Sequence, residues 1–254
     1  MARIIAVANQ KGGVGKTTTA VNLSSCLAYL GKKTLLIDCD PQGNSTSGFG
    51  IEKTDDMLSV YECLADASQT KQAVIKTNYI NMYVIPSSSD LSAAEIELAY
   101  EDKREFFLKK AIAEIKDSFD YIIIDSPPSL GMITINILTA ADSVLIPIQC
   151  EYYALEGVSQ LISTIKSIKK KLNPKIAIEG ILATMYDGRT NLSIQVLDEV
   201  KRFFSDKLYK TVIPRNIRLS EAPSFGEPII KYDRTSKGAS AYMALAKEVI
   251  AKTT

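Results

Sequence analysis

The chain reads Gln10-Lys11-Gly12-Gly13-Val14-Gly15-Lys16-Thr17-Thr18 directly after an apolar run at residues 4–8. An apolar strand that ends in a glycine-rich turn and then begins a helix leaves several backbone N–H groups unpaired in one concavity, which attracts phosphate oxygens. Lys16 supplies a positive charge for the β- and γ-phosphates, and the hydroxyl of Thr17 can bind Mg²⁺. The sequence therefore predicts a phosphate-binding loop with nucleotide contacts at Gly12, Gly13, Val14, Gly15, Lys16, Thr17 and Thr18.

Two further apolar runs end on carboxylates. Residues 34–38 lead into Asp38-Cys39-Asp40, and residues 121–125 end on Asp125, which two prolines follow closely. Carboxylates at the C-terminal ends of parallel strands lie beside the phosphate loop, where ligands collect in open α/β sheets. Asp125 is placed to hold Mg²⁺ through water, as a Walker B aspartate does. Taken alone, each aspartate is explained equally well as a turn-forming residue and as a ligand.

The loop departs from the ordinary pattern at its entrance, where Gln10 replaces the expected glycine and a second lysine, Lys11, follows. Lys11 is either a solvated surface residue or a contact to a nucleotide held by another copy of the chain. The loop resembles that of the deviant Walker A ATPases, which has the form KGGxGKT. In that family the leading lysine crosses to the phosphates of the partner subunit. The resemblance thus implies a homodimer with ATP and Mg²⁺ in which Lys11 and Lys16 both act in catalysis.

The whole chain resembles the ParA/Soj branch of that family, the chromosome and plasmid partition ATPases. The resemblance runs from residue 2 to about residue 250 and rests on the segments 9–19, 38–48, 125–130, 149–157 and 212–223. It implies the short chromosomal type, a single ATPase domain over residues 1–254 without an N-terminal helix-turn-helix domain.

The same resemblance assigns roles to individual residues. Asp40 would orient or activate the attacking water, while Asp38, with Thr17 and Asp125, would support the Mg²⁺ shell. Pro214 and Asn216 would lie against the adenine, although Pro214 is also explained as an ordinary strand-ending proline.

Composition excludes several kinds of chemistry. The chain has no histidine, so histidine-activated nucleophiles, histidine metal ligands and a histidine pH switch are excluded. Cys26, Cys39, Cys63 and Cys150 form no C-x-x-C pair, which is typical of reduced, buried thiols. No stretch approaches the roughly 20 apolar residues of a membrane span, and the N-terminus lacks the layout of a signal peptide. We therefore expect a cytoplasmic protein.

Apolar strand patterns alternate with helical patterns along the chain. This alternation predicts an α/β fold of the P-loop NTPase type, a single domain with a mostly parallel, twisted β-sheet covered by helices on both faces. Strands are expected near residues 3–9, 34–38, 82–86, 120–125, 143–148, 178–184 and 209–213. Helices are expected at residues 16–30, 103–117, 155–171, 191–206 and 237–251.

Charge is distributed unevenly between the two ends of the chain. Residues 158–254 hold 17 Lys/Arg against 9 Asp/Glu, a balance of +8, whereas the remaining 13 against 20 give −7. Lysines at the end of one helix can be simply solvated, but an excess of this extent is typical of a surface that binds a phosphate backbone. The resemblance to Soj-like proteins assigns the DNA contacts to Arg189 and Arg218. No base-reading motif is visible, so we expect non-specific binding of double-stranded DNA.

The resemblance also implies a centromere-binding partner of the ParB/Spo0J kind, whose basic N-terminal peptide stimulates hydrolysis, and association with the nucleoid. A MinD-like ATPase that positions a complex on the membrane is the main alternative. It needs a C-terminal amphipathic helix, and the Ala-rich segment 239–251 instead suggests a helix packed on the core, so no stable membrane association is expected. An iron–sulfur electron carrier would need paired cysteines, and an amidoligase would need a substrate pocket with no recognisable residues here.

Overall fold

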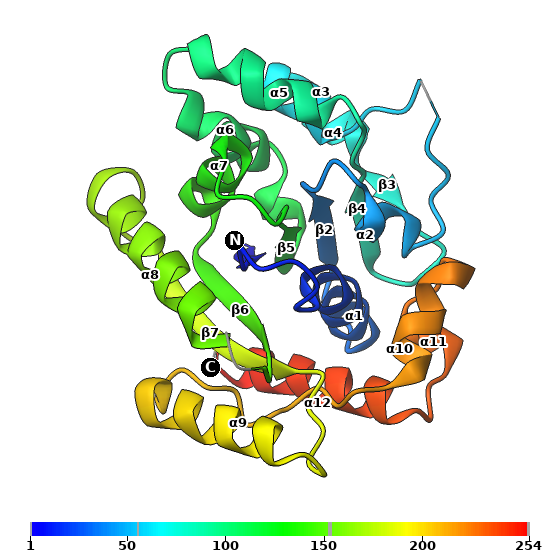
Figure 1. Ribbon diagram of the computed structural model, residues 1–254. Coiled ribbons are helices and arrows are strands. Elements are labelled where there is room, and N and C mark those ends of the chain that lie inside the picture. The colour runs from blue at the N-terminus through cyan, green and yellow to red at the C-terminus, as the bar shows by residue number, and fades with distance from the viewer. Residues whose placement is uncertain (1, 55, 152–153, 253–254) are drawn as a thin grey trace.

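A computed structural model describes residues 2–54, 56–151 and 154–252. Its centre is a seven-stranded sheet in the order β3-β4-β2-β5-β1-β6-β7. All neighbouring strands pair in parallel except β3, which is antiparallel to β4. Figure 1 shows helices on both sides of this sheet. The predicted α/β fold with a mostly parallel sheet is therefore confirmed.

Six of the seven strands lie where the sequence predicts them. The strands are β1 (Arg3–Val7), β2 (Thr34–Asp38), β3 (Ile75–Lys76), β4 (Met82–Ile85), β5 (Tyr121–Asp125), β6 (Ser143–Gln149) and β7 (Ala177–Thr184). The central strands β2 and β5 are buried at every residue, as the nearly continuous apolar runs of a sheet covered on both faces require.

The long helices also lie close to their predicted positions. The helices are α1 (Lys16–Tyr29), α2 (Asn44–Ser47), α3 (Val60–Ala65), α4 (Thr70–Ala73), α5 (Leu91–Glu97), α6 (Phe107–Ala113), α7 (Met132–Ala140), α8 (Ala154–Lys171), α9 (Asn191–Phe204), α10 (Ile217–Glu221), α11 (Ile229–Tyr232) and α12 (Lys237–Ala251). Of the segment 149–157 that carries part of the family resemblance, Tyr152 and Tyr153 lie outside the described residues.

Alternate residues of the central strands contribute to different layers of the core. Ile5 of β1 and Ile123 of β5 pack with α1 and α12, while Ile4 and Ile124 pack with α3, α5, α6 and α7. The far end of the sheet, β6 and β7, is covered by α8 and α9. Because helices cover both faces, a ligand is expected at the carboxyl ends of the strands, where open α/β sheets bind their ligands.

Two predicted elements are wrong. Residues 209–213 do not form a regular strand. The segment has isolated bridges of Leu208 with Ile181 and of Pro214 with Tyr186, and the backbone N–H groups of Tyr209 and Ile213 donate to the carbonyls of Ile181 and Ala183, both at 2.9 Å. The predicted helix 103–117 is broken into a 3₁₀ turn at Arg104–Phe106, helix α6 and a second 3₁₀ turn at Lys116–Ser118. Lys103 has a left-handed backbone (φ 55°), which the first turn of a regular α-helix excludes.

The C-terminal helix α12 is part of the core. Ser236 caps its N-terminus, accepting a hydrogen bond from the backbone N–H of Ala239 (3.1 Å). Tyr242, Leu245 and Val249 are buried in the same cluster as α1, and the Tyr242 hydroxyl lies 3.2 Å from Oγ1 of Thr19. The expectation of a packed terminal helix is therefore confirmed. None of the helices in the described part of the chain has both the length and the apolar character needed to span a bilayer.

Candidate active site

The loop between β1 and α1 has the backbone geometry of an anion-binding turn. Gly13 and Gly15 have φ values of 74° and 84°, in the left-handed region that favours glycine, whereas Gly12 does not. Helix α1 begins at Lys16, immediately after Gly15. The first N–H groups of α1 therefore face the space that the loop surrounds, as phosphate binding requires.

Two polar side chains outside the glycine motif hold this loop. The Asn9 amide donates to the carbonyl of Pro147 (2.8 Å) and accepts from the backbone N–H of Lys11 (3.0 Å). The Thr184 hydroxyl, at the end of β7, lies within hydrogen-bonding distance of the carbonyls of Val14 (2.8 Å) and Ile148 (2.9 Å). The sequence gives no role to Thr184, because its partner is 170 residues away in the chain.

Lys16 is buried at 7% exposure, and its ammonium donates to the carbonyl of Lys11 (3.1 Å). Burial lowers the pKa of Lys16, and the negative charges of Asp125 and Asp40 oppose this shift. A desolvated ammonium beside unpaired backbone N–H groups is well suited to bind phosphate, because the negatively charged phosphate pairs with it.

Asp38 and Asp125 end neighbouring strands and lie opposite each other in the register of β2 and β5. Both are fully buried. Burial, with the repulsion between the two carboxylates, raises the pKa of Asp125 to about 7, and burial raises that of Asp38 to about 6. Two buried carboxyl groups so close together cannot both ionise without cost unless a cation joins them.

Helix α2 supplies the donors that hold these carboxylates. Oδ2 of Asp38 accepts from the backbone N–H and the hydroxyl of Thr46, both at 2.7 Å. Oδ2 of Asp125 accepts from the hydroxyl of Ser45 (2.8 Å). No role for Ser45 and Thr46 was predicted from the sequence. Their signal is the run of hydroxyl residues 45–47, which begins five positions after the predicted catalytic Asp40.

The donor set at this position fits Mg²⁺. Oδ1 of Asp125 is buried and accepts no hydrogen bond from the described residues. The Thr17 hydroxyl also acts as a donor that lowers the pKa of Asp125, so it lies on the same side of the loop. No group of three or more acidic or cysteine side chains forms a metal cage in the described chain. Hard oxygen donors in small number are typical of magnesium sites that also use substrate phosphates.

Asp40 lies at the mouth of the phosphate loop. It is 8% exposed and lines a cavity of about 260 Å³ together with Gly12, Gly13, Gly15, Lys16, Thr17, Thr18, Asn44, Pro128 and Met185. The backbone carbonyl of Asp40 accepts from the Ser87 hydroxyl (2.7 Å), and its Oδ1 accepts from the backbone N–H of Gln42 (3.0 Å). The structure thus brings Asp40 to the same cavity as Lys16 and Thr17.

Lys11 points away from this cavity within its own chain. Its ammonium pairs with Oε2 of Glu151 at 3.2 Å, and both side chains are partly exposed (34% and 49%). The geometry therefore does not bring Lys11 to the phosphate pocket of its own loop. This placement fits both interpretations of Lys11 given by the sequence, a solvated surface residue and a contact to another copy of the chain.

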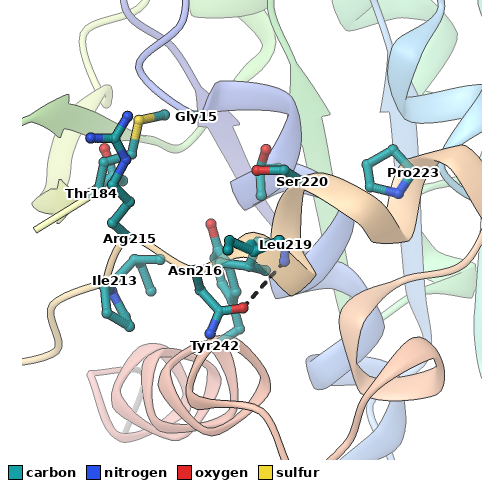
Figure 2. A pocket seen from close by; sticks show the side chains of 13 residues that line it. Gly15, Thr184, Ile213, Arg215, Asn216, Leu219, Ser220, Pro223 and Tyr242 are labelled. Atoms are coloured by element: carbon teal, nitrogen blue, oxygen red, sulfur yellow. Dashed lines mark hydrogen bonds between the residues drawn. The ribbon is translucent and has the colours of Figure 1, made fainter.

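A second cavity of about 300 Å³ adjoins the loop (Figure 2). Gly15 and Thr18 form one side, and Ile213, Pro214 and Asn216 form the other. Asn216 caps α10, because its Oδ1 accepts from the backbone N–H of Leu219 (3.3 Å), so the amide nitrogen stays available. A mostly apolar cavity next to a phosphate loop is suited to a nucleoside base, so the contacts of Pro214 and Asn216 with adenine stay a prediction.

The two arginines predicted to contact DNA lie on the surface in separate elements. Arg189 precedes α9 and Arg218 is in α10, and their side chains are 90% and 54% exposed. Both belong to the basic C-terminal half of the chain, outside the two cavities just described.

The fold and this site define a P-loop ATPase. The family model described as an AAA domain, AAA_31, matches residues 2–178. The sporulation initiation inhibitor protein Soj of Bacillus subtilis (strain 168) is 60% identical over 251 residues, which cover 99% of each chain. The chromosome partitioning protein ParA of Myxococcus xanthus (strain DK1622) is 51% identical over 252 residues, 99% of this chain and 89% of that protein.

A solved structure of a protein named for a different function shares this fold. Cobyrinic acid a,c-diamide synthase from Mycobacterium smegmatis, with bound ATP analog and magnesium, superimposes with a TM-score of 0.83. It is 38% identical and covers 98% of this chain and 95% of its own. The chain belongs to the ParA/Soj family of chromosome-partitioning ATPases. Full-length relatives of this kind favour the partition function over the membrane-positioning and amidoligase alternatives.

Proposed function

We propose that the protein hydrolyses ATP in a Mg²⁺-dependent cycle and that two chains hold two ATP molecules between them. The observation that carries this proposal is the position of Lys11. The loop already has its own buried cation in Lys16, while Lys11 lies at the surface on an exposed ion pair with Glu151. An exposed pair of this kind contributes little to stability, so Lys11 can leave it for a phosphate of the opposite chain.

Within each pocket, the described residues would divide the work of phosphoryl transfer to water. The N–H groups of Gly13 to Thr18 and the Lys16 ammonium would bind the phosphates. Thr17, Asp38 and Asp125 would hold Mg²⁺, which neutralises charge on the phosphates. Asp40, at the open side of the same cavity, would orient the attacking water. Such a reaction depends mainly on positioning and charge stabilisation.

The ATP-bound dimer would bind double-stranded DNA without sequence preference through Arg189 and Arg218. Two copies of each arginine double the number of phosphate contacts, so dimerisation itself raises the affinity for DNA. A centromere-binding partner of the ParB/Spo0J kind would stimulate hydrolysis with a basic N-terminal peptide and release the protein. The cycle would place the protein in the cytoplasm, in association with the nucleoid.

The decisive experiment measures the oligomeric state by size exclusion with light scattering. We expect a monomer with ADP and a dimer with a non-hydrolysable ATP analogue and Mg²⁺. Lys11→Ala should still bind the analogue and remain a monomer, whereas Lys71→Ala, at an exposed ion pair far along the chain, should dimerise as the wild type does. A wild-type protein that stays monomeric when saturated with analogue and Mg²⁺ contradicts the proposal.

A further inference from the structure

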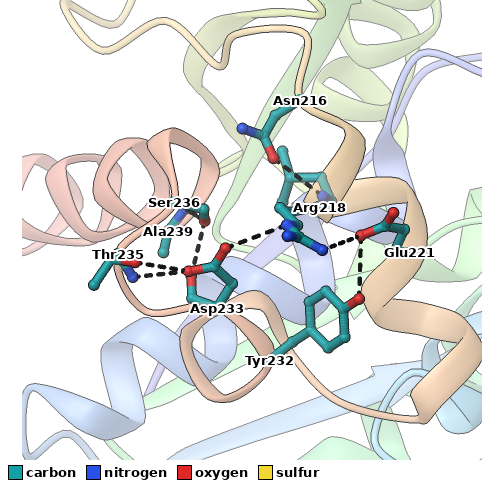
Figure 3. Close-up of polar contacts among 9 residues, drawn as sticks. Asn216, Arg218, Glu221, Tyr232, Asp233, Thr235, Ser236 and Ala239 are labelled. Atoms are coloured by element: carbon teal, nitrogen blue, oxygen red, sulfur yellow. Dashed lines mark hydrogen bonds and ion pairs between the residues drawn. The ribbon is translucent and has the colours of Figure 1, made fainter.

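The two arginines proposed to bind DNA are each held by carboxylates of their own chain. Nε and Nη2 of Arg189 lie 2.9 and 2.7 Å from the two carboxylate oxygens of Asp187. Arg218 lies between two acids: Nη1 is 2.9 Å from Oε2 of Glu221, and Nε is 3.4 Å from Oδ2 of Asp233 (Figure 3). A DNA phosphate must therefore take the place of these carboxylates, or share the guanidinium with them.

Other contacts fix the three carboxylates in place. Oδ1 of Asp187 also accepts from the backbone N–H of Arg189 (3.1 Å). Oε2 of Glu221 accepts from the Tyr232 hydroxyl (3.1 Å), as Figure 3 shows. Because each acid has a partner besides the guanidinium, it keeps its position when the arginine side chain moves.

Asp233 is fixed in the same way. Its Oδ1 accepts from the backbone N–H and the hydroxyl of Thr235, at 3.1 and 2.9 Å. The turn that these contacts form leads directly into Ser236, the N-cap of α12. The carboxylate that faces Arg218 therefore belongs to the start of a helix packed in the core.

Carboxylate and phosphate use the same geometry on a guanidinium group. Arginine binds either anion with two parallel N–H donors, and Asp187 occupies two such donors of Arg189. An exposed pair is weak enough for DNA to displace, and a fixed carboxylate within a Debye length also repels the incoming phosphate. Each acid thus lowers the affinity of the arginine beside it for DNA without preventing contact.

We propose that Asp187, Glu221 and Asp233 compete with DNA phosphates for Arg189 and Arg218, and that they set how tightly the protein holds DNA. This inference rests on the proposed DNA-binding function. Competition of this kind keeps the affinity of a single chain low, so that only the doubled contacts of a dimer hold DNA. The three acids are then binding determinants of the DNA surface, although none of them contacts DNA.

The test replaces each acid by its isosteric amide, Asp187→Asn, Glu221→Gln and Asp233→Asn, which keeps the shape and the neutral hydrogen bonds. Affinity for a random-sequence DNA duplex is measured by fluorescence anisotropy with a non-hydrolysable ATP analogue and Mg²⁺. We expect each change to tighten binding about threefold per site, hence about tenfold for a dimer in which every site occurs twice. Glu114→Gln, which removes an exposed acid paired with Lys71 (3.7 Å) in the acidic half, should leave the affinity unchanged.

A double-mutant cycle separates this competition from a general effect of charge. Asp187→Asn should tighten binding in the wild type and have no effect in the Arg189→Ala background, because its target is then absent. A gain that persists without Arg189, or unchanged affinity in all three amide variants, overturns the proposal. If Arg189→Ala and Arg218→Ala weaken binding in that case, the proposed DNA surface still stands. If those two variants bind DNA as the wild type does, the DNA surface is itself wrong.

Discussion

At the scale of single residues, the site is defined by charges that the protein alone does not neutralise. The Lys16 ammonium is a buried cation that donates a hydrogen bond to the carbonyl of Lys11, and Asp125 is a buried acid with one oxygen that accepts no hydrogen bond from the described residues. Groups of this kind cost stability unless a ligand completes them. The site is therefore built for a charged ligand that brings both phosphate and a cation.

Asp40→Ala tests the residue proposed to position water. We expect hydrolysis to fall by about 100-fold or more, while nucleotide binding persists, because Asp40 lies at the cavity mouth and does not hold the loop. The variant should accumulate as an ATP-bound dimer on DNA, measured by phosphate release and gel shift. Asp206→Ala, at an exposed acid, serves as the control. Normal turnover in the Asp40 variant removes this residue from the mechanism.

Asp125→Asn tests how much the buried acid pair lowers the free energy of unfolding when no ligand is bound. The native pKa is raised to about 7, above the ordinary value of 3.8, so the folded protein holds a proton that the unfolded chain releases. Ionisation of Asp125 thus removes stability as the pH rises from about 4 to about 7, and asparagine avoids this loss. In EDTA and without nucleotide, the variant should be more stable by about 1–3 kcal/mol at pH 8.

The same variant should lose this advantage as the pH falls towards 4, because the wild-type carboxyl is then protonated in both states. Thermal unfolding at several pH values measures the difference, with the exposed Asp117→Asn as control. A variant less stable than the wild type at pH 8 contradicts the cost assigned to this charge. With no histidine in the chain, this acid pair is the main group expected to titrate near neutral pH.

At the scale of elements, an ion pair with a buried carboxylate joins three strands. Glu179 of β7 accepts from Nη2 of Arg3 in β1 (2.6 Å), from the Ser143 hydroxyl in β6 (2.7 Å) and from the Tyr209 hydroxyl (3.0 Å). Gly180, next in β7, has no room for a side chain, since an added Cβ would lie 2.5 Å from the Tyr209 ring. The segment after α9, where a strand was predicted, is therefore held by the Tyr209 side chain together with backbone hydrogen bonds from Tyr209 to Ile181 and from Ile213 to Ala183, both 2.9 Å.

Glu179→Ala should destabilise the protein by about 3 kcal/mol or more, because it removes the carboxylate that Arg3, Ser143 and Tyr209 share in the core. Urea unfolding followed by circular dichroism measures the free energy. Glu199→Ala, an exposed acid on α9, should change stability by no more than about 0.5 kcal/mol. Equal stability of the two variants would show that the Glu179 cluster does not hold the edge of the sheet.

The sequence predicted the elements whose signal is local and missed those that depend on tertiary contacts. The apolar runs that end on Asp38 and Asp125 predicted their strands correctly, and the glycine pattern predicted the turn before Lys16. Helix α3 does have a local signal, the capping box of Ser59 and Glu62, which the prediction did not use. The segment 209–213 has the apolar character of a strand, yet its N–H groups donate to β7 only at Tyr209 and Ile213 among the described residues, so it forms no continuous ladder.

The candidate site was predictable to the same extent. Residues within the phosphate loop and at the ends of apolar runs could be named, because glycine spacing and terminal carboxylates have a direct chemical meaning. The residues that orient them could not. Thr46 and Thr184 reach their partners across 8 and 170 residues, and hydroxyl side chains are too common to indicate such contacts.

At the scale of the whole molecule, the packing of the C-terminal helix α12 bears on the choice between a partition ATPase and a membrane-positioning ATPase. A membrane-positioning ATPase needs a terminal helix that is free to bind lipid. Here α12 covers α1, and Tyr242 of α12 is hydrogen-bonded to Thr19 in the first turn of α1. The end of the chain therefore stabilises the helix that carries the nucleotide site.

Leu245→Ala tests this role of α12. Leu245 is fully buried against α1, so the change should cost about 2–5 kcal/mol of unfolding free energy, measured by chemical denaturation. Lys247→Ala, an exposed position on the same helix, should be neutral. Wild-type protein with ATP should stay in the supernatant when anionic vesicles are sedimented. Unchanged stability together with weaker vesicle binding in the Leu245 variant would instead indicate a membrane anchor.

The burial of the four thiols has a practical consequence for following this molecule in action. All four thiols are buried: Cys26, Cys39, Cys63 and Cys150. Burial raises the pKa of Cys26 to about 12 and the pKa values of Cys63 and Cys150 to about 11. It raises the pKa of Cys39 as well. Thiols in that condition react slowly with maleimide dyes at neutral pH. One new cysteine on an exposed helix face could carry a fluorophore without removal of the native four, which makes single-particle tracking accessible with minimal engineering.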